Sequence, residues 1–363
     1  MMVVLREGAS ADERAAVARI FSAHGLDVPV TLPSPVGVVL YSAAPAAEPN
    51  AVAAALATLP GVAHVIAEHP PYPLASRALR PEKTIVQVGG AAIGGLAPVI
   101  IAGPCAVESE AQVHAAAQAA HAAGAALLRG GAYKPRTSPY TFQGLGLPGM
   151  RMLARAGAEF GLPIVTEVME PGLVPAVAEI ADVLQIGSRN MQNFPLLRAA
   201  GRSGRPVLLK RGFAATIDEW LLAAEYVLAE GNPNVILCER GVRSFDSQTR
   251  NVLDLACVPL LGELTHLPVV VDPSHATGRR KLILPMGLAA IAAGADGLLV
   301  EMQPDPDAAI SDGPQTIDPA TLQRLVHGAR CVRAALAEQE YGQGTQVNAD
   351  MHDAPEEPAE VTR

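Results

Sequence analysis

Residues 183–211, VLQIGSRNMQNFPLLRAAGRSGRPVLLKR, contain one complete copy of the pattern that decides the fold. The segment begins with the apolar run VLQIGS and ends with a second apolar run, PVLLKR, and an amphipathic stretch of helical length separates the two. Short runs that are apolar throughout are typical of parallel strands whose two faces are both covered. The segment therefore predicts a strand, a helix and a second strand of one parallel sheet.

The same alternation extends over most of the chain, from about Val99 onward. Six further apolar runs, each followed by a helical segment, are VIIAGPC (99–105), ALLRGGA (126–132), PIVTEV (163–168), VILCERG (235–241), PVVVDPS (268–274) and GLLVEM (297–302). Eight strand–helix repeats over roughly 240 residues indicate a closed (β/α)8 TIM barrel of the α/β class. An open doubly wound sheet is the structural alternative, and it suits eight repeats less well.

The N-terminal sequence has a different pattern, which predicts a small independent domain at residues 1–70. Its short apolar strands alternate with two helices, at about residues 12–24 and 51–59, in the order βαββαβ. This order is the ferredoxin-like α+β pattern. Prolines then mark residues 71–98 as a linker that leads into the barrel, and the catalytic barrel itself is predicted over residues 99–337.

The composition narrows the class of protein further. The net charge of −9 disfavours a general binder of nucleic acid or of acidic membranes. Residues 338–363 hold seven acidic residues and one basic residue, so they are predicted to form a disordered acidic tail. No apolar run approaches the ~20 residues that cross a bilayer, and Arg6 and Glu7 interrupt the position of a signal peptide. Because the four cysteines also lack CxxC spacing, we expect a soluble, cytoplasmic protein.

The ends of the predicted strands carry cationic side chains. In a barrel of this kind the catalytic groups lie at the C-terminal mouth, where each strand ends and its following loop begins. Six cations fall at these positions: Arg129, Lys134, Arg136, Arg189, Lys210 and Arg240. Cations at this density repel one another unless an anion neutralises them, and guanidinium donors match phosphate and carboxylate oxygens. The alternative is a structural ion-pair network with Glu167, Glu239 and Asp272.

A second set of side chains at the same mouth could bind a metal ion. The set consists of Cys105, His275, Glu301 and Asp312. One sulfur, one imidazole and two carboxylates suit a divalent transition metal, without strong selectivity among Mn, Fe, Co and Zn. A metal beside anion pockets can polarise a carbonyl oxygen while cations hold phosphorylated substrates in register.

The main competing phosphate and hydrolase motifs are missing from the sequence. It contains no GxxxxGK[ST], no GxGxxG that opens a helix after a strand, and no GxSxG elbow. The glycine-rich stretch GGAAIGG, at residues 89–95, lacks the strand–helix context of a nucleotide site, so we interpret it as a turn.

Long blocks of sequence at the strand ends carry a family resemblance. The blocks are IAGPCAVES, LLRGGAYKPRTSPYTFQGLG, VTEVM, QIGSRNMQNFPLL, VLLKRG, ILCERGVRSFD, VVVDPSHATGRR and VEMQPDPDAAISDGPQ. In this order they resemble the 3-deoxy-D-arabino-heptulosonate 7-phosphate (DAHP) synthases, and most closely the bacterial subtype with an N-terminal ferredoxin-like domain. The resemblance covers about residues 1–335. It implies a metal-dependent transferase that condenses phosphoenolpyruvate with erythrose 4-phosphate and releases phosphate, the first step of the shikimate pathway towards chorismate and the aromatic amino acids.

The resemblance also implies a role for each candidate residue. The metal ligands correspond to Cys105, His275, Glu301 and Asp312. The phosphoenolpyruvate site corresponds to Arg129, Lys134, Arg189, Lys210 and Arg240, with Glu167 beside it. The erythrose 4-phosphate site corresponds to Lys134, Pro135, Arg136 and Thr137. Lys134 belongs to both sites and is the candidate general acid, whereas either Glu167 or a water on the metal activates the attacking water.

Two other functions are kept as alternatives. A 3-deoxy-D-manno-octulosonate 8-phosphate synthase shares the barrel and the phosphoenolpyruvate half, but its loop differs from KPRTS at residues 134–138. An amino-acid-sensing protein with an inactive barrel is disfavoured by the complete metal and cation sets. The resemblance further implies feedback inhibition by an aromatic amino acid through residues 1–70 and a homotetramer; the alternative for residues 1–70 is a purely packing or oligomerising role.

Overall fold

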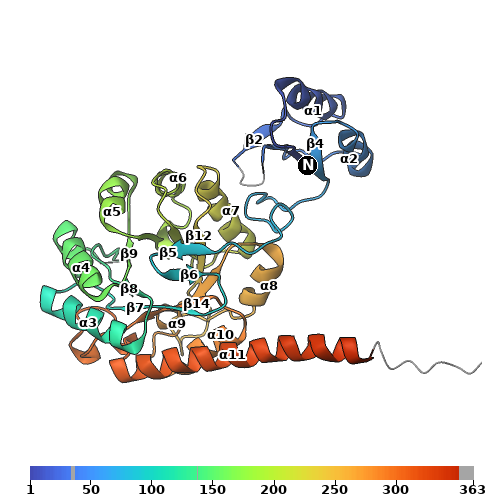
Figure 1. Ribbon diagram of the computed structural model, residues 1–363. Helices are drawn as coiled ribbons and strands as arrows, with labels where there is room; N and C mark the ends of the chain where they lie inside the picture. Colours follow the sequence, from blue (N-terminus) through green and yellow to red (C-terminus); the bar gives the residue numbers. More distant parts are fainter. Residues whose placement is uncertain (34–36, 137, 351–363) are drawn as a thin grey trace, which may run out of the picture.

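The computed structural model describes residues 1–33, 37–136 and 138–350 of the chain. Figure 1 shows two units: a small N-terminal domain in dark blue, and a large barrel with its surrounding helices. The segment that joins the two units runs beside α7 (Ile217–Leu228) on the outside of the barrel.

The N-terminal domain is an antiparallel four-stranded sheet with two helices. Its elements are β1 (Met2–Leu5), α1 (Ala11–Ala23), β2 (Val30–Leu32), β3 (Val39–Tyr41), α2 (Pro49–Ala57) and β4 (Val62–Ile66). The strand order in the sheet is β2-β3-β1-β4. Ser10 caps α1 and Glu13 completes a capping box, while Phe21 and Leu56 bury their side chains in a core that belongs to this domain alone. The predicted ferredoxin-like order βαββαβ is confirmed.

Eight parallel strands form a closed barrel. In chain order they are β7 (Val99–Gly103), β8 (Leu127–Arg129), β9 (Ile164–Glu167), β10 (Val183–Ile186), β11 (Val207–Lys210), β12 (Val235–Glu239), β13 (Val269–Val271) and β14 (Gly297–Glu301). The last strand pairs back onto the first, with Glu301 opposite Gly103. The predicted (β/α)8 barrel is confirmed, and its closure excludes the open doubly wound sheet.

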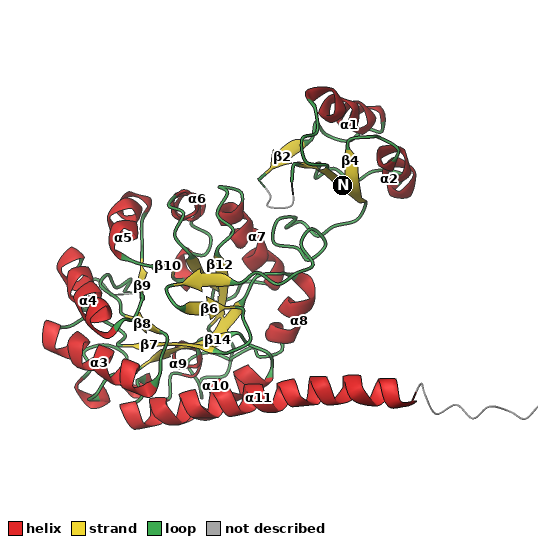
Figure 2. Cartoon of the chain, viewed as in Figure 1, coloured by secondary structure: helices red, strands yellow, loops and turns green. Residues whose placement is uncertain are grey.

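Helices surround the barrel, as Figure 2 shows in red around the yellow strands. Besides α7 they are α3 (Glu110–Ala123), α4 (Leu147–Phe160), α5 (Val174–Ile180), α6 (Phe194–Arg202), α8 (Cys257–Leu264), α9 (Pro273–Thr277), α10 (Arg280–Ala292) and α11 (Pro319–Asp350). Helix α7 illustrates their packing. Thr216 and Glu219 form a capping box at its start, and the buried Trp220 donates from Nε1 to the Leu209 carbonyl of β11 at 3.1 Å.

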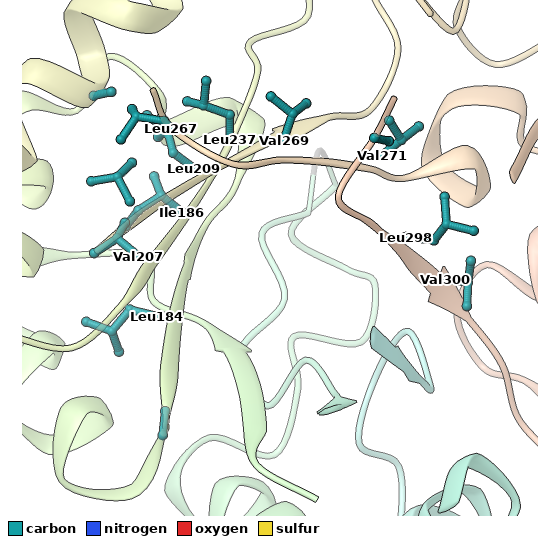
Figure 3. Close-up of a cluster of buried hydrophobic side chains, with 14 of the residues drawn as sticks. Leu184, Ile186, Val207, Leu209, Leu237, Leu267, Val269, Val271, Leu298 and Val300 are labelled. Atoms are coloured by element: carbon teal, nitrogen blue, oxygen red, sulfur yellow. The ribbon is translucent and has the colours of Figure 1, made fainter. Parts of the chain in front are cut away.

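Alternate side chains of the strands build two separate apolar layers. On β11, Leu208 belongs to the cluster inside the barrel, whereas Val207 and Leu209 belong to the cluster between strands and helices. Figure 3 shows this outer cluster along β10 to β14, for example at Leu184 and Leu237. Successive side chains of a strand point to opposite faces, so a strand that is buried on both faces must be apolar throughout.

A short hairpin closes the end of the barrel opposite the mouth. Strands β5 (Val86–Val88) and β6 (Ala91–Ile93) pair antiparallel, and Val86, Val88 and Ile93 belong to the cluster inside the barrel. Gly89 lies against Pro163, which directly precedes β9. The interpretation of GGAAIGG as a turn is therefore wrong for residues 91–93, because burial of Ile93 under the barrel stabilises a strand there.

Residues 72–84 of the linker bind along the outside of the barrel. The Ala75 amide donates to Glu225 Oε1 on α7 at 2.8 Å, and Thr265 Oγ1 donates to the Ala75 carbonyl. Burial raises the pKa of Glu225 to about 7, although backbone amides of the linker favour its ionised form. Glu225 is therefore a titratable contact between the linker and the barrel.

We expect Glu225→Gln to raise the melting temperature above pH 7. When folding raises the pKa of a carboxyl group, the contribution of that group to stability is complete below the pKa of the unfolded chain, 4.5. This contribution is lost as the pH rises through the pKa of the folded chain, about 7. Glutamine stays neutral and still accepts the Ala75 amide. Melting curves should differ at pH 8 and nearly coincide at pH 5, with the exposed Glu263→Gln as the matched control. If Glu225→Gln and the unchanged chain have the same melting temperature at pH 8, this explanation is refuted.

Helix α11 is longer than the sequence predicts. It continues to Asp350, so the prediction of a disordered tail is wrong for residues 338–350. Leu322 and Leu325 anchor its first turns in the core, and a helix that is already nucleated extends readily through the Ala, Gln and Glu residues of segment 334–340. Residues 351–363 of the predicted tail lie outside the described residues. No helix within the described ranges is both long and apolar enough to cross a membrane.

Candidate active site

A cavity of about 330 Å³ lies at the mouth of the barrel, where the strands end. The predicted site residues that line it are Arg129, Lys134, Pro135, Arg136, Glu167, Arg189, Lys210, Arg240, His275 and Asp312. With Arg250, which was not predicted, seven Lys or Arg side chains face two carboxylates among the described lining residues. Thr137 lies outside the described residues. The excess of cations favours an anionic ligand.

The four predicted metal ligands lie together beside this cavity. The donor atoms of Cys105, His275, Glu301 and Asp312 all lie within 4.8 Å of one another. His275 Nε2 is 3.2 Å from Glu301 Oε1, and Cys105 Sγ is 3.1 Å from Asp312 Oδ2. Cys105 follows β7, His275 follows β13, Glu301 ends β14 and Asp312 lies in the loop after β14, so the cluster forms only when the barrel closes.

Asp272 orients the imidazole of His275. It caps α9 by accepting from the His275 amide at 2.9 Å, and its Oδ2 accepts from His275 Nδ1 at 2.7 Å and from Lys210 Nζ at 2.6 Å. Burial opposes ionisation of Asp272, but His275 and Lys210 hold its pKa well below the ordinary value. The ionised Asp272 makes Nδ1 the protonated nitrogen, so the lone pair of Nε2 faces the metal-ligand cluster.

The donor set fits a bound divalent cation. Burial lowers the pKa of His275, so its ring is neutral near pH 7 and Nε2 faces a Glu301 oxygen as a lone pair. Burial also opposes ionisation of Glu301, but the positive charges around it, those of Arg129 and Lys134 among them, hold the pKa of that carboxyl far below its usual range. Two electron-rich atoms at 3.2 Å repel each other unless a cation binds both. Sulfur, imidazole and carboxylate together suit a transition metal.

Asp312 reaches the cluster through an uncommon backbone conformation. Its φ of 58° lies in the left-handed region, and no other non-glycine residue in the described ranges has a positive φ. Aspartate tolerates this region better than most residues, and such strain concentrates at functional sites. The conformation brings Oδ2 to Cys105, while Oδ1 lies 3.3 Å from Arg250 NH1.

Lys134 links the metal-ligand cluster to the cationic cavity. It is buried, and its Nζ donates to the Cys105 carbonyl at 2.9 Å and to Cys105 Sγ at 3.0 Å. Gly131 makes room for it, because a Cβ there would lie only 2.8 Å from Lys134 Cδ. Burial raises the pKa of the Cys105 thiol to about 12, and the positive charge of Lys134 acts in the opposite direction. Lys134 therefore favours the thiolate form that binds a metal.

Two of the cations also make buried ion pairs. Arg129 NH1 lies 2.7 Å from Glu301 Oε1, and Lys210 Nζ lies 2.6 Å from Asp272 Oδ2. The ion-pair alternative thus applies to these contacts, but it leaves Arg129 Nε buried without a hydrogen-bond partner among the described residues. A buried donor without an acceptor is costly. A ligand oxygen bound in the cavity could supply that acceptor.

Glu167 ends β9 and lines the cavity beside Gly187. Its Oε2 accepts from Gln185 Nε2 at 3.1 Å. A Cβ at position 187 would lie 2.1 Å from Glu167 Oε1, so only glycine leaves this carboxylate in place. Arg189 follows two residues later, in a short 3-10 helix (Ser188–Asn190), and lines the same cavity.

Glu239 lies outside the cavity, although the ion-pair alternative grouped it with the cations of the mouth. It is fully buried and pairs with Arg211 at 3.2 Å, and Arg211 pairs in turn with Asp254 at 2.8 Å. The next residue, Arg240, lines the cavity. The two neighbours have different surroundings because consecutive side chains of an extended chain point in opposite directions.

Sequence reasoning did not find Arg250 and Phe213, which both line the cavity. It considered the strand ends, and Arg250 lies far along the loop after β12 in SFDSQTRN. Its NH1 donates to Gln315 Oε1 at 2.9 Å, close to the metal-ligand cluster. The basic side chain in that loop was the available signal, whereas nothing in the local sequence distinguishes Phe213 from a core residue.

The fold and the cavity define the class of protein: a (β/α)8-barrel enzyme that binds anionic substrates beside a site suited to a divalent metal. The sequence model of the DAHP synthetase I family matches residues 81–335, which include the whole barrel. The chain belongs to this family, and it is an enzyme of the DAHP synthase type.

Known proteins resemble this chain over most of its length. A phospho-2-dehydro-3-deoxyheptonate aldolase of Thermotoga maritima is 49% identical over 266 residues, which are 73% of this chain and 79% of the relative. A crystal structure of that kind of enzyme (DAHP synthase), also from Thermotoga maritima, has a TM-score of 0.73 and 42% identity, and covers 92% of this chain and 97% of its own. A 2-dehydro-3-deoxyphosphooctonate aldolase of Rhodopseudomonas palustris is more distant, 34% identical over 72% of this chain and 96% of the relative.

Proposed function

We propose that this enzyme condenses phosphoenolpyruvate with erythrose 4-phosphate and releases phosphate. The observation that carries the proposal is a cavity with seven cations directly beside a sulfur, imidazole and carboxylate cluster, in a chain of the DAHP synthetase I family. Two phosphorylated substrates need more positive charge than one, and a Lewis acid at the aldehyde oxygen makes the acceptor carbon more electrophilic.

The phosphoenolpyruvate site consists of cations from neighbouring strand ends. Its proposed residues are Arg129, Lys134, Arg189, Lys210 and Arg240. Arg129, Lys210 and Arg240 are buried, so the anion that they bind is held in a medium where charge–charge interactions are strong. Burial also lowers the pKa of Arg240, with the nearby Arg250 acting in the same direction, and an anion relieves both effects.

The erythrose 4-phosphate site is proposed at Lys134, Pro135, Arg136 and Thr137. Arg136 NH2 donates to Ser311 Oγ at 2.7 Å, and its Nε donates to the Phe142 carbonyl at 3.0 Å. These contacts hold the guanidinium group of Arg136 on the side of the cavity that carries Ser311, the residue before Asp312. The sugar phosphate thus binds near the metal-ligand cluster, and the placement of Thr137 rests on the family motif alone.

The proposed metal ligands are Cys105, His275, Glu301 and Asp312, for an ion of the Mn, Fe, Co or Zn class. When bound, such an ion supplies a Lewis acid for the aldehyde oxygen of the second substrate. Asp272 keeps the His275 lone pair directed at the cluster, and Lys134 favours the Cys105 thiolate.

Two side chains of the cavity are proposed to move protons. The methylene carbon of phosphoenolpyruvate forms the new bond with the aldehyde carbon, and Lys134 gives a proton to the aldehyde oxygen as its negative charge develops. Water then adds to the neighbouring cationic carbon, and Glu167, held by Gln185, accepts its proton. The resulting hemiketal phosphate releases phosphate by cleavage of its C–O bond.

The experiment that tests this proposal is a substrate comparison. Enzyme loaded in turn with Mn, Fe, Co and Zn is assayed for phosphate release from phosphoenolpyruvate, with either erythrose 4-phosphate or arabinose 5-phosphate as acceptor. The second acceptor is included because 2-dehydro-3-deoxyphosphooctonate aldolases are among the relatives. Faster turnover with arabinose 5-phosphate would assign the chain to that activity instead, and the fastest metal would identify the preferred ion.

We expect Arg136→Ala to raise the KM for erythrose 4-phosphate by roughly 10- to 100-fold, because a hydrogen bond from a charged donor contributes about 1.5 to 3 kcal/mol. The KM for phosphoenolpyruvate should change less than threefold. Initial rates with each substrate varied in turn give both constants. Equal increases in the two constants would show that the sites are not divided in this way.

Residues 1–70 are proposed to be a regulatory domain for an aromatic amino acid, in a homotetramer. Support comes from the separate core of this domain and from the family resemblance. Deleting residues 1–70 leaves the bound linker segment 72–84 intact, so the barrel should stay active. Inhibition by tyrosine or phenylalanine should disappear on deletion, and inhibition that survives would place the effector elsewhere. Sedimentation of both forms measures the oligomeric state.

A further inference from the structure

Three guanidinium groups surround the ring of Phe213. The Cζ atoms of Arg240, Arg243 and Arg189 lie 4.8, 4.9 and 5.4 Å from the ring centroid. Phe213 lies in the loop between β11 and α7, and it is a partly buried residue that lines the cavity at the mouth. No other ring in the described part of the chain has more than one guanidinium over it.

The arginines come from loops on both sides of Phe213. Arg189 follows β10 and Arg240 follows β12, the two strands that flank β11 in the barrel. The Arg243 amide donates to the Phe213 carbonyl at 2.7 Å, which joins the loop after β12 to the loop after β11. The ring therefore has a fixed backbone position between the two cations that line the cavity.

An aromatic ring is well suited to hold these cations before an anion binds. Guanidinium groups that converge on one site repel one another, and a long Arg side chain loses rotamer freedom when an anion immobilises it. The negative face of a phenyl ring attracts a guanidinium within about 6 Å of its centroid without competing for its hydrogen-bond donors. The ring thus attracts a guanidinium group without occupying its N–H donors, although in Arg240 two of these donors also bond to the Gly241 and His275 carbonyls.

We infer that Phe213 is a positioning residue that holds Arg189 and Arg240 in place for the anion of the first substrate, with Arg243 as an outer support. The inference deepens the proposed function and rests on it for the identity of that anion. A phenyl ring has no group that could ligate a metal ion or transfer a proton. Its effect should therefore appear in anion affinity and hardly in kcat.

The test compares Phe213→Leu, Phe213→Tyr and Phe213→Trp in the full-length, metal-loaded enzyme. Calorimetric titrations measure Kd for phosphoenolpyruvate and, separately, for inorganic phosphate, and initial rates give kcat and both KM values. Phe194→Leu is the matched control, because Phe194 stacks on Tyr226 at 4.4 Å on the outside of the barrel. Melting temperatures show that every variant is folded.

We expect Phe213→Leu to raise Kd for both anions about tenfold, which corresponds to about 1.4 kcal/mol. The KM for erythrose 4-phosphate and kcat should change less than twofold, and Tyr or Trp should restore Kd to within twofold of the unchanged enzyme.

Unchanged phosphate affinity in Phe213→Leu overturns the inference, and so does a loss that Tyr and Trp fail to restore. If the enzyme does not turn over phosphoenolpyruvate but Phe213→Leu still weakens phosphate binding, the proposed function fails while the positioning role stands.

Discussion

Replacing Cys105 by alanine is expected to lower kcat by roughly a thousandfold or more, since the Lewis acid of a metal site contributes several kcal/mol to the transition state. The buried Cys105 Sγ is one of the four clustered donor atoms, and it alone supplies a soft ligand. Its loss leaves one imidazole and two carboxylates, which bind transition metals less tightly. Metal content by atomic emission and turnover before and after treatment with a chelator measure the effect.

The matched control for this variant is Cys238→Ala, which removes another buried thiol from the barrel. Cys238 lies in the apolar cluster inside the barrel and is not one of the four clustered donors. It should keep its metal and its turnover, although both variants lose a little stability from the small cavity that each creates. A Cys105→Ala enzyme that stays fully active in metal-free buffer would refute the assignment of the metal site.

Replacing Lys134 by methionine is expected to lower kcat by roughly 10²- to 10⁴-fold, the usual contribution of a general acid. Methionine fills a similar volume beside Gly131 but cannot give a proton. Its effect on the two KM values should be smaller than its effect on kcat. Pre-steady-state and steady-state rates with both substrates separate the chemical step from binding.

Lys134→Arg distinguishes proton transfer from simple positive charge. Arginine keeps the charge but does not release its proton near neutral pH, so kcat should stay as low as in the methionine variant. The exposed Lys281→Met serves as a control for the loss of one lysine and should behave as the unchanged enzyme. Recovery of kcat in Lys134→Arg would mean that Lys134 acts only through its charge.

The barrel could be predicted because its signal is local. The residues VLL of β11 are apolar on both faces, and the structure shows why: Leu208 and Leu209 enter different apolar clusters. The ends of the strands could be predicted for the same reason, and strand direction places Glu167 and Glu301 at the mouth. Local patterns failed where burial against a distant segment decides the structure, as at Ile93.

The partners within the site could not be predicted, since each contact depends on a distance set by the whole fold. Glu239 and Arg240 are neighbours in sequence, yet Glu239 pairs with Arg211 outside the cavity, whereas Arg240 lines the cavity. The grouping of three arginines around Phe213 likewise depends on loops that follow three different strands.

By itself the sequence determined the barrel, the small N-terminal domain and the residue types gathered at the mouth, because the period of apolar residues and the ends of strands are local properties. Only the tertiary structure decided which side chains meet. Cys105 and Asp312 are 207 residues apart in the chain, yet Cys105 Sγ lies 3.1 Å from Asp312 Oδ2. Metal coordination, ion pairs and cation–π contacts all act over a few ångströms, so they exist only after the barrel has closed.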